Sequence, residues 1–130
     1  MTQLKDPAIL RTRCYINGQW LDADSGHTIA VSNPATGETI GSVPDMGAAE
    51  AERTVAAAQS ALPAWRALTA KQRSQILRRW FDLMMEAQEE LATLLTLEQG
   101  KPLAESRGEI AYGASYIEWY AEEAKRVYGD

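Results

Sequence analysis

Cysteine and histidine are almost absent from this 130-residue sequence. The single cysteine, Cys14, excludes an internal disulfide, and such cysteine usage predicts a reducing compartment, which we take to be the cytoplasm. Cys14 stands in an apolar stretch, which favours a packing role over a nucleophilic one. The single histidine, His27, lies in a predicted turn, so neither a two-histidine metal site nor a histidine-dependent triad is expected.

Long apolar runs and an excess of positive charge are also missing. No segment approaches the ~20 apolar residues that a membrane span needs, and residues 1–13 lack the apolar run of a signal peptide. Asp and Glu total 18 against 13 Lys and Arg, and the net charge of −5 argues against a nucleic-acid surface. We therefore expect neither a membrane nor a nucleic acid as a partner.

The sequence does contain a strand-rich region, residues 14–44. Asn17-Gly18 supplies the two positive-φ positions of a type I′ turn, which predicts a hairpin over residues 14–21. Further strands are predicted at residues 28–31 and 38–43, separated by the turn at Asn33-Pro34-Ala35-Thr36-Gly37.

Residues 47–127 are predicted to form a helical layer. Thr69 and Gln72 have the spacing of a capping box, Gly100 is placed to end one helix, and Pro102 is placed to start the next. The first of these helices carries an apolar stripe made of Ala51, Val55, Ala58 and Leu62. The expected fold class is mainly α with short N-terminal β-hairpins.

The last predicted helix, residues 102–127, is ~39 Å long and is apolar on two sides. One side carries Ile110, Ala114, Ile117, Ala121 and Ala124. The other side carries Tyr112, Tyr116 and Trp119. Residues 110 and 112 point ~200° apart around the helix axis, so the two sets lie on opposite sides. The three earlier helices and the small hairpin region can cover one side only. The aromatic side is therefore expected to be covered by polypeptide outside these 130 residues, or by a partner.

The residues alone predict no catalytic, cofactor-binding or metal-binding site. The pairs Glu89-Glu90 and Glu122-Glu123 lie ~100° apart on a helix, so they do not converge on one proton. Gly108 and Gly113 are spaced unlike a G-x-G-x-x-G turn, and no strand precedes them. Each of these glycines costs about 1 kcal/mol in a helix interior, which indicates close packing or a ligand nearby.

Several stretches occur together in the order found in one family. They are Tyr15-Ile16-Asn17-Gly18-Gln19-Trp20, NPATGETIGSVPDMG (33–47), PAWRALTAKQRSQILRRWFDLM (63–84) and LATLLTLEQGKPLAESRGEI (91–110). This set resembles the N-terminal part of the aldehyde dehydrogenase superfamily. The ending EWYAEEAKRVYGD (118–130) resembles the succinate-semialdehyde dehydrogenase branch and its neighbour that oxidises glutarate semialdehyde.

The resemblance implies that residues 1–130 are the N-terminal segment of an NADP- or NAD-dependent enzyme that oxidises succinate semialdehyde to succinate. The parent enzyme would be α/β with a Rossmann-type nucleotide-binding domain, would take a small-molecule aldehyde and would form a homo-oligomer. Its catalytic cysteine and glutamate, its nucleotide-binding units and its oligomerisation strand are expected downstream. The segment alone is then expected to be inactive, to bind no cofactor and to self-associate through its exposed apolar face.

The same resemblance gives the last helix a role in the substrate entrance channel, with Tyr112 facing the channel and Gly108 and Tyr116 one turn to either side. Two alternatives stay open. One is a glutarate-semialdehyde dehydrogenase. The other is a free-standing, non-enzymatic helical module whose aromatic side docks a partner helix.

Overall fold

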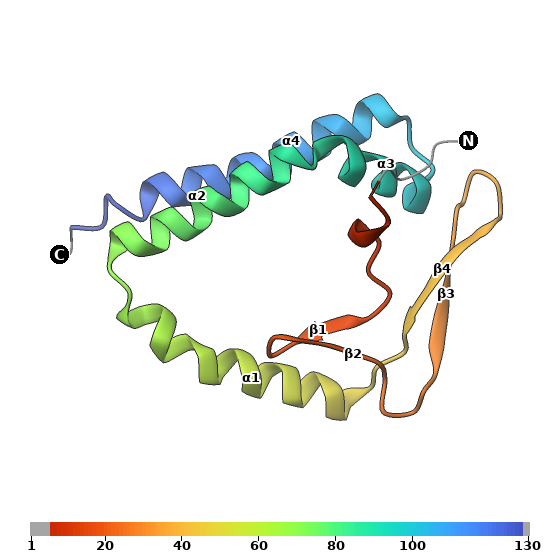
Figure 1. The fold of residues 1–130 in the computed structure, drawn as a ribbon, viewed down its shortest axis with the longest axis horizontal. Helices are drawn as coiled ribbons and strands as arrows, with labels where there is room; N and C mark the ends of the chain where they lie inside the picture. The colour runs from red at the N-terminus through yellow and green to blue at the C-terminus, as the bar shows by residue number, and fades with distance from the viewer. Residues whose placement is uncertain (1–5, 129–130) are drawn as a thin grey trace.

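The computed structural model describes residues 6–128, which form short strands followed by helices (Figure 1). Within these residues the order is a 3-10 turn at Pro7–Ile9, four strands and four α-helices. The strands are β1 (Cys14–Ile16), β2 (Gln19–Leu21), β3 (Thr28–Ser32) and β4 (Thr39–Pro44). The helices are α1 (Ala48–Ala67), α2 (Ala70–Glu86), α3 (Gln88–Gln99) and α4 (Leu103–Glu123). The predicted fold class is confirmed.

The strands form two separate antiparallel hairpins, β1–β2 and β3–β4. Asn17 and Gly18 both have positive φ, 49° and 80°, as the predicted type I′ turn requires. The second hairpin turns at residues 33–37, where the Asn33 side chain accepts a hydrogen bond from the Ala35 N–H. A register irregularity between Val31 and Ser32 accompanies this turn.

Local capping chemistry sets the helix boundaries. At the start of α1, the carboxylate of Glu50 accepts hydrogen bonds from the N–H groups of Gly47 and of Asp24, each at 3.0 Å. Glu50 therefore ties the segment between β2 and β3 to the first turn of α1. The predicted capping box of α2 is present, because the Gln72 N–H donates to the Thr69 hydroxyl and the Thr69 N–H donates to the Gln72 side chain.

The connection between α3 and α4 follows the predicted signals, with one difference. Gly100 adopts the left-handed conformation (φ 74°, ψ 9°) directly after α3. Pro102 occupies the N-cap of α4, and the helix begins at Leu103, one residue later than predicted. The N–H groups of Glu105 and Ser106 donate to the Pro102 carbonyl, which accounts for this boundary.

The packed part of the molecule lies where α2 and α3 meet α4. Figure 1 shows α2 and α4 side by side along their length, with α3 at one end. The side chains at this contact are small: Ala92, Ala114, Ala121 and Ser106 are all 0% exposed. Small residues at the contact let the helices approach closely. The covered side of α4 is the predicted stripe, which consists of Ile110, Ala114, Ile117, Ala121 and Ala124.

Of the three earlier helices, α2 and α3 pack against α4, and α1 does not. It lies apart from the α2–α4 pair, with the β1–β2 hairpin beside it (Figure 1). Its predicted apolar stripe is exposed, as Val55 and Leu62 show. The reason is that Pro44 to Gly47 and the Leu68-Thr69 corner both turn the chain away from the helix pair.

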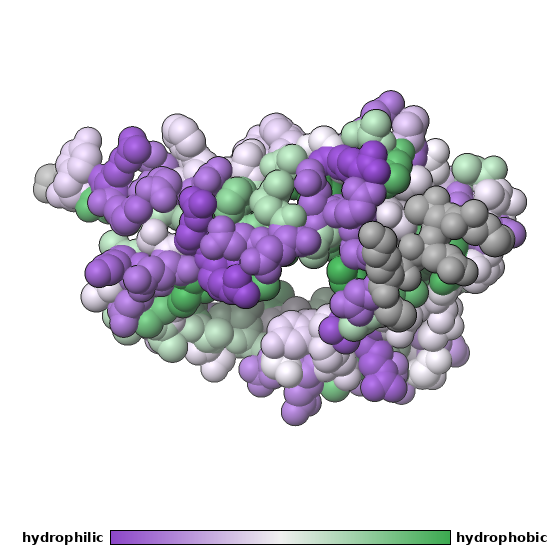
Figure 2. Space-filling model, turned by 45° about the horizontal axis from the view of Figure 1, so that its top comes forward, coloured by the Kyte–Doolittle hydropathy of each residue, from purple (hydrophilic) through white to green (hydrophobic). Residues whose placement is uncertain are grey.

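The molecule exposes far more surface than a compact protein of its size. A folded monomer of 14.3 kDa exposes roughly 6,800 Å², whereas this chain exposes 9319 Å². Figure 2 shows apolar side chains, in green, reaching the surface around an opening in the middle of this face. The excess of about 2,500 Å² exceeds the ~800 Å² that each partner buries in a standard protein interface.

The last helix ends earlier than the predicted residue 127. After Glu123 the chain continues in turns in which the N–H groups of Lys125 and Arg126 donate to carbonyls three residues back. Val127 and Tyr128 are almost fully exposed. Because these two side chains bury little surface, packing adds little to the stability of a further helical turn.

Candidate functional site

The aromatic side of α4 carries several large side chains that the described chain leaves exposed. Tyr112 is 64% exposed, Tyr116 51% and Trp119 62%. The prediction that the chain's own earlier helices leave this side uncovered is confirmed. The physical reason is that α2 and α3 both pack on the opposite, alanine-rich side of α4.

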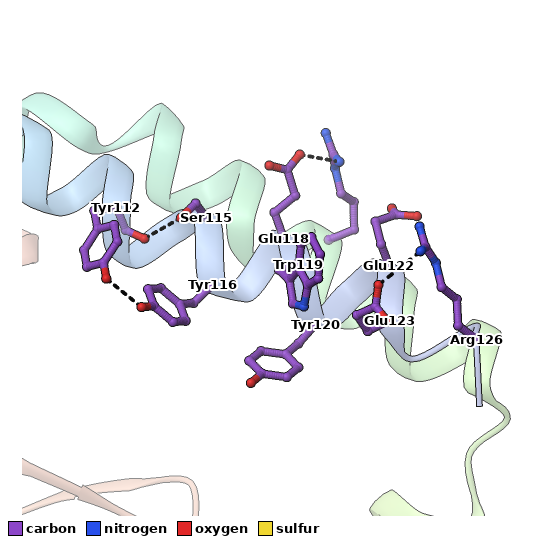
Figure 3. Close-up of a pocket in the computed structure, with 10 residues that line it drawn as sticks. Tyr112, Ser115, Tyr116, Glu118, Trp119, Tyr120, Glu122, Glu123 and Arg126 are labelled. Atoms are coloured by element: carbon purple, nitrogen blue, oxygen red, sulfur yellow. Dashed lines mark hydrogen bonds and ion pairs between the residues drawn. The ribbon is translucent and has the colours of Figure 1, made fainter. Parts of the chain in front are cut away.

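An open groove of about 720 Å³ runs along this side of α4 (Figure 3). Most of its wall comes from α4 itself, and one residue, Arg78, comes from α2. Its lining residues are Arg78, Tyr112, Ser115, Tyr116, Glu118, Trp119, Tyr120, Glu122, Glu123 and Arg126. The groove is thus an aromatic wall that becomes charged towards the C-terminal end of the helix.

Tyr112 and Tyr116 form a pair at one end of the groove. Their hydroxyl oxygens lie 2.6 Å apart, and their rings meet edge to face with centroids 5.1 Å apart. Figure 3 shows the two rings projecting from α4 and meeting at their hydroxyl groups. The hydrogen bond shared with Tyr112 and, second, partial desolvation raise the pKa of Tyr116 above its usual value.

The charged groups of the groove are paired with one another. Arg78 bridges α2 and α4, because Nη1 lies 3.0 Å from Glu118 and Nε lies 3.3 Å from Asp82. The ammonium of Lys125, 2.6 Å from Glu122, lowers the pKa of that carboxyl group. These ion pairs are exposed, so their main effect is to fix side-chain positions; their contribution to stability is small.

The structure brings two of the three predicted channel residues together. Tyr112 and Tyr116 line the groove, whereas Gly108 lies one turn before Tyr112 on the same helix and is not among the lining residues. A methyl group added at Gly108 or at Gly113 would meet no atom within 4 Å. Among the described residues, nothing packs against either glycine.

Sequence reasoning missed Arg78, Ser115, Tyr120 and the acidic residues of the groove. Ser115 and Tyr120 follow Tyr112 and Tyr116 at helical spacings of three and four, a signal that the aromatic stripe could have supplied. No local signal pairs Arg78 with Glu118, because the two residues are 40 positions apart.

The remaining candidates form no site in the described part of the chain. Cys14 is half-buried in β1, and His27 is exposed in the loop before β3. Glu89 forms a two-pronged ion pair with Arg107 across α3 and α4, with N–O distances of 2.8 and 2.6 Å. Across residues 6–128 no cluster of three or more His, Cys, Asp or Glu side chains is placed to hold a metal ion. No helix in that range is long and apolar enough to cross a membrane.

The described residues do not form a Rossmann-type dinucleotide site. That type of site uses parallel strands joined through helices, with free N–H groups at a helix N-terminus. Both sheets within residues 6–128 are two-stranded antiparallel hairpins. The N-termini of α1 and α2 are occupied by their own Glu50 and Thr69 side chains. No residue of this structure is therefore assigned to a nucleotide.

Comparison with known proteins gives a consistent result. A sequence model described as the aldehyde dehydrogenase family matches residues 20–130. A glutarate-semialdehyde dehydrogenase of Pseudomonas putida is 69% identical over 128 residues, which is 98% of this chain and 27% of that protein. The NADP(+) succinate-semialdehyde dehydrogenase of Escherichia coli is 62% identical over 128 residues, again 98% of this chain and 27% of the relative.

Solved structures share the fold. The succinate-semialdehyde dehydrogenase of Burkholderia pseudomallei superposes with a TM-score of 0.95 at 59% identity, covering 99% of this chain and 27% of the other. The chain thus spans about a quarter of the length of the relatives that it matches. Because the family match extends over residues 20–130, the chain belongs to the aldehyde dehydrogenase family.

Proposed function

We propose that this chain is the N-terminal part of an NADP- or NAD-dependent enzyme that oxidises succinate semialdehyde to succinate, with glutarate semialdehyde as the alternative substrate. Support for a semialdehyde comes from relatives that are 62–69% identical and carry these two names. In that enzyme the segment supplies structure and part of the substrate path. The catalytic cysteine, the catalytic glutamate and the nucleotide site would come from the remaining polypeptide.

The observation that carries this proposal is the exposed aromatic side of α4. A helix whose covered side is packed to 0% exposure at Ala114 and Ala121 also presents Tyr112, Tyr116 and Trp119 to solvent. Large apolar patches exposed on a folded protein mark a contact with other polypeptide or with a ligand. In the proposed enzyme, the catalytic part would lie over this side and leave a passage for the aldehyde.

Gly108, Tyr112 and Tyr116 are the residues that we assign to this passage. They follow one another at intervals of four residues and so share one side of α4. Gly108 has no side chain, and the space beside it is open. The passage could therefore continue past Gly108, beyond the end of the groove. A full-length Tyr112→Ala variant should therefore change the KM or the substrate preference. An unchanged KM and preference would count against a role in the passage.

The direct test is an assay of the full-length enzyme that contains this segment. We expect NADP or NAD to be reduced in the presence of succinate semialdehyde or glutarate semialdehyde. The ratio of the two kcat/KM values identifies the preferred substrate, and the same assay identifies the cofactor. Failure to oxidise any aldehyde would refute the proposal. Turnover by residues 1–130 alone would refute the expectation that this segment is inactive.

The second candidate, a free-standing interaction module, is not favoured by the structure's exposed surface. A free-standing module that docks one partner helix through its aromatic side would still be compact over the rest of its surface. This chain instead exposes about 2,500 Å² more than a compact monomer. We expect the isolated segment to self-associate, and the parent enzyme to be a cytoplasmic homo-oligomer. Sedimentation velocity on both proteins measures these states.

A further inference from the structure

One side of α2 carries apolar side chains that the described chain leaves exposed, although α2 lies along α4 (Figure 1). Ile76 is 50% exposed, Trp80 54% and Leu83 45%. These residues follow one another at spacings of four and three, so they share one side of the helix. This side of α2 is therefore a second exposed apolar surface, in addition to the aromatic side of α4.

The three side chains line an open groove of about 610 Å³, which shares no residue with the groove on α4. The other residues that line it are Leu68, Gln72, Gln75 and Arg79. Arg79 is the one charged residue among them, and its Nη1 lies 3.5 Å from the Glu86 carboxylate. A helix side that faces water normally carries several charged residues. The composition of this groove is that of a surface in contact with other polypeptide.

The chain leaves α4 close to the beginning of this groove. A further open groove, of about 520 Å³, has Trp65 and Arg73 from either side of the α1–α2 corner among its lining residues, together with Ala124 and Val127 from the end of the chain. Arg73 also donates to the carbonyl of Leu68, which lines the groove on α2. Figure 1 shows the C-terminal end of the chain beside this corner. Polypeptide that continues from residue 130 would therefore emerge near the Leu68 end of the α2 groove.

The amount of exposed surface indicates cover at more than one place. The excess of about 2,500 Å² over a compact monomer is about three times the ~800 Å² that each partner buries in a standard interface. One standard interface on α4 accounts for only part of it. Nearly three quarters of the Pseudomonas putida relative lies outside the matched part, which is enough polypeptide to cover a second side.

We propose that the groove on α2 is the contact surface for polypeptide of the same chain that lies beyond residue 130. This inference rests on the proposed function, which takes residues 1–130 as the N-terminal part of a longer enzyme. The occupant presents apolar side chains to Ile76, Trp80 and Leu83. It fixes the α2–α4 pair to the rest of the enzyme at a place separate from the aromatic side of α4.

The test is photo-crosslinking in the full-length enzyme. The photoreactive amino acid p-benzoylphenylalanine replaces Trp80 in one variant and Ile76 in a second, so the result does not depend on one substitution. Lys71, which is exposed and lies ~140° from Ile76 around α2, takes the same probe as the matched control. Melting temperatures confirm that each variant is folded. A denaturing gel separates crosslinks within one chain from crosslinks between two copies, which double the mass, and mass spectrometry identifies the linked peptide.

We expect the probes at Trp80 and Ile76 to link, within one chain, to a peptide beyond residue 130, with a yield several-fold above that of the Lys71 control. A product of doubled mass would show that a second copy occupies the groove. Yields equal to the control would show that the groove faces solvent, and a link to a peptide within residues 1–130 would show that the segment covers itself. Each of these three results would overturn the inference. The crosslink is read without turnover, so an enzyme that gives the expected link and oxidises no aldehyde would refute the proposed activity and leave this contact standing.

Discussion

The buried hydroxyl contact between α3 and α4 offers a quantitative test of how the site helix is held. Ser106 of α4 is 0% exposed, and its Oγ lies 2.8 Å from the Oγ1 of Thr96 on α3. The two bonded residues are ten positions apart in sequence, and their hydrogen bond joins α3 to α4 across the corner at Gly100.

The expected magnitude follows from the burial of Ser106. Ser106→Ala removes one partner and leaves the half-buried Thr96 hydroxyl without its bond, which costs about 1 kcal/mol. Thr96→Val keeps the shape of the side chain and leaves the fully buried Ser106 hydroxyl without a partner, which costs about 1–3 kcal/mol. The double variant leaves no unpaired hydroxyl, so its loss should be smaller than the sum of the single losses by about 1 kcal/mol.

The assay is urea unfolding of the chain followed by helical circular dichroism, on both single variants and the double variant. Ser60→Ala on the exposed α1 is the matched control, because it makes the same change within a helix without burial. The reasoning would be refuted if Ser106→Ala and Ser60→Ala changed the free energy of unfolding equally, or if the two single effects were additive.

Three further outcomes are expected. For Glu50, hydrogen bonds from the Asp24 and Gly47 N–H groups lower the pKa below its ordinary 4.5. Its stabilisation is therefore present above pH 4.5 and is lost as the pH falls through the lowered value. Glu50→Gln should melt earlier than the unmodified chain at pH 7, and this difference should shrink below pH 4.5; a pH-independent difference would contradict this. Gly100→Ala should lower the free energy of unfolding by about 1–2 kcal/mol or more, because φ is 74° and the new methyl would lie 3.0 Å from Pro34 Cγ; an unchanged urea midpoint would contradict it. Ala114→Leu, at a position 0% exposed between α2 and α4, should cost about 1–3 kcal/mol through overpacking, and a stabilised variant would show that this contact is loose.

Features that depend on a few neighbouring residues were predictable from the sequence. Asn17-Gly18 determines its hairpin through two positive φ angles, and Gly100 ends α3 because few other residues tolerate φ near 74°. The capping box at Thr69 and Gln72 is likewise local. The two sides of α4 were also predictable, because helical periodicity alone separates Ala114 from Tyr112.

Features that depend on how the helices are placed were not predictable. The direction of α1 is determined at two corners, and nothing in its apolar stripe shows that Val55 and Leu62 stay exposed. The Arg78–Glu118 and Glu89–Arg107 ion pairs join residues that only the tertiary fold brings together. Sequence periodicity predicted that the last helix ends at residue 127, four residues after the observed end at Glu123. Periodicity does not show how well the residues after Glu123 are packed, and the helix end depends on that packing.

The central claim is that the aromatic side of α4 is built to lie under polypeptide that these 130 residues do not supply. Hydroxyl-radical labelling measures it directly, by comparing the reactivity of Tyr112, Tyr116 and Trp119 in the isolated chain and in the full-length enzyme. Tyr128, which is 96% exposed, provides a reference within the chain. The account predicts that the three α4 side chains become several-fold less reactive in the full-length enzyme, relative to the isolated chain at concentrations where it is monomeric. Equal reactivity in the two proteins would contradict it.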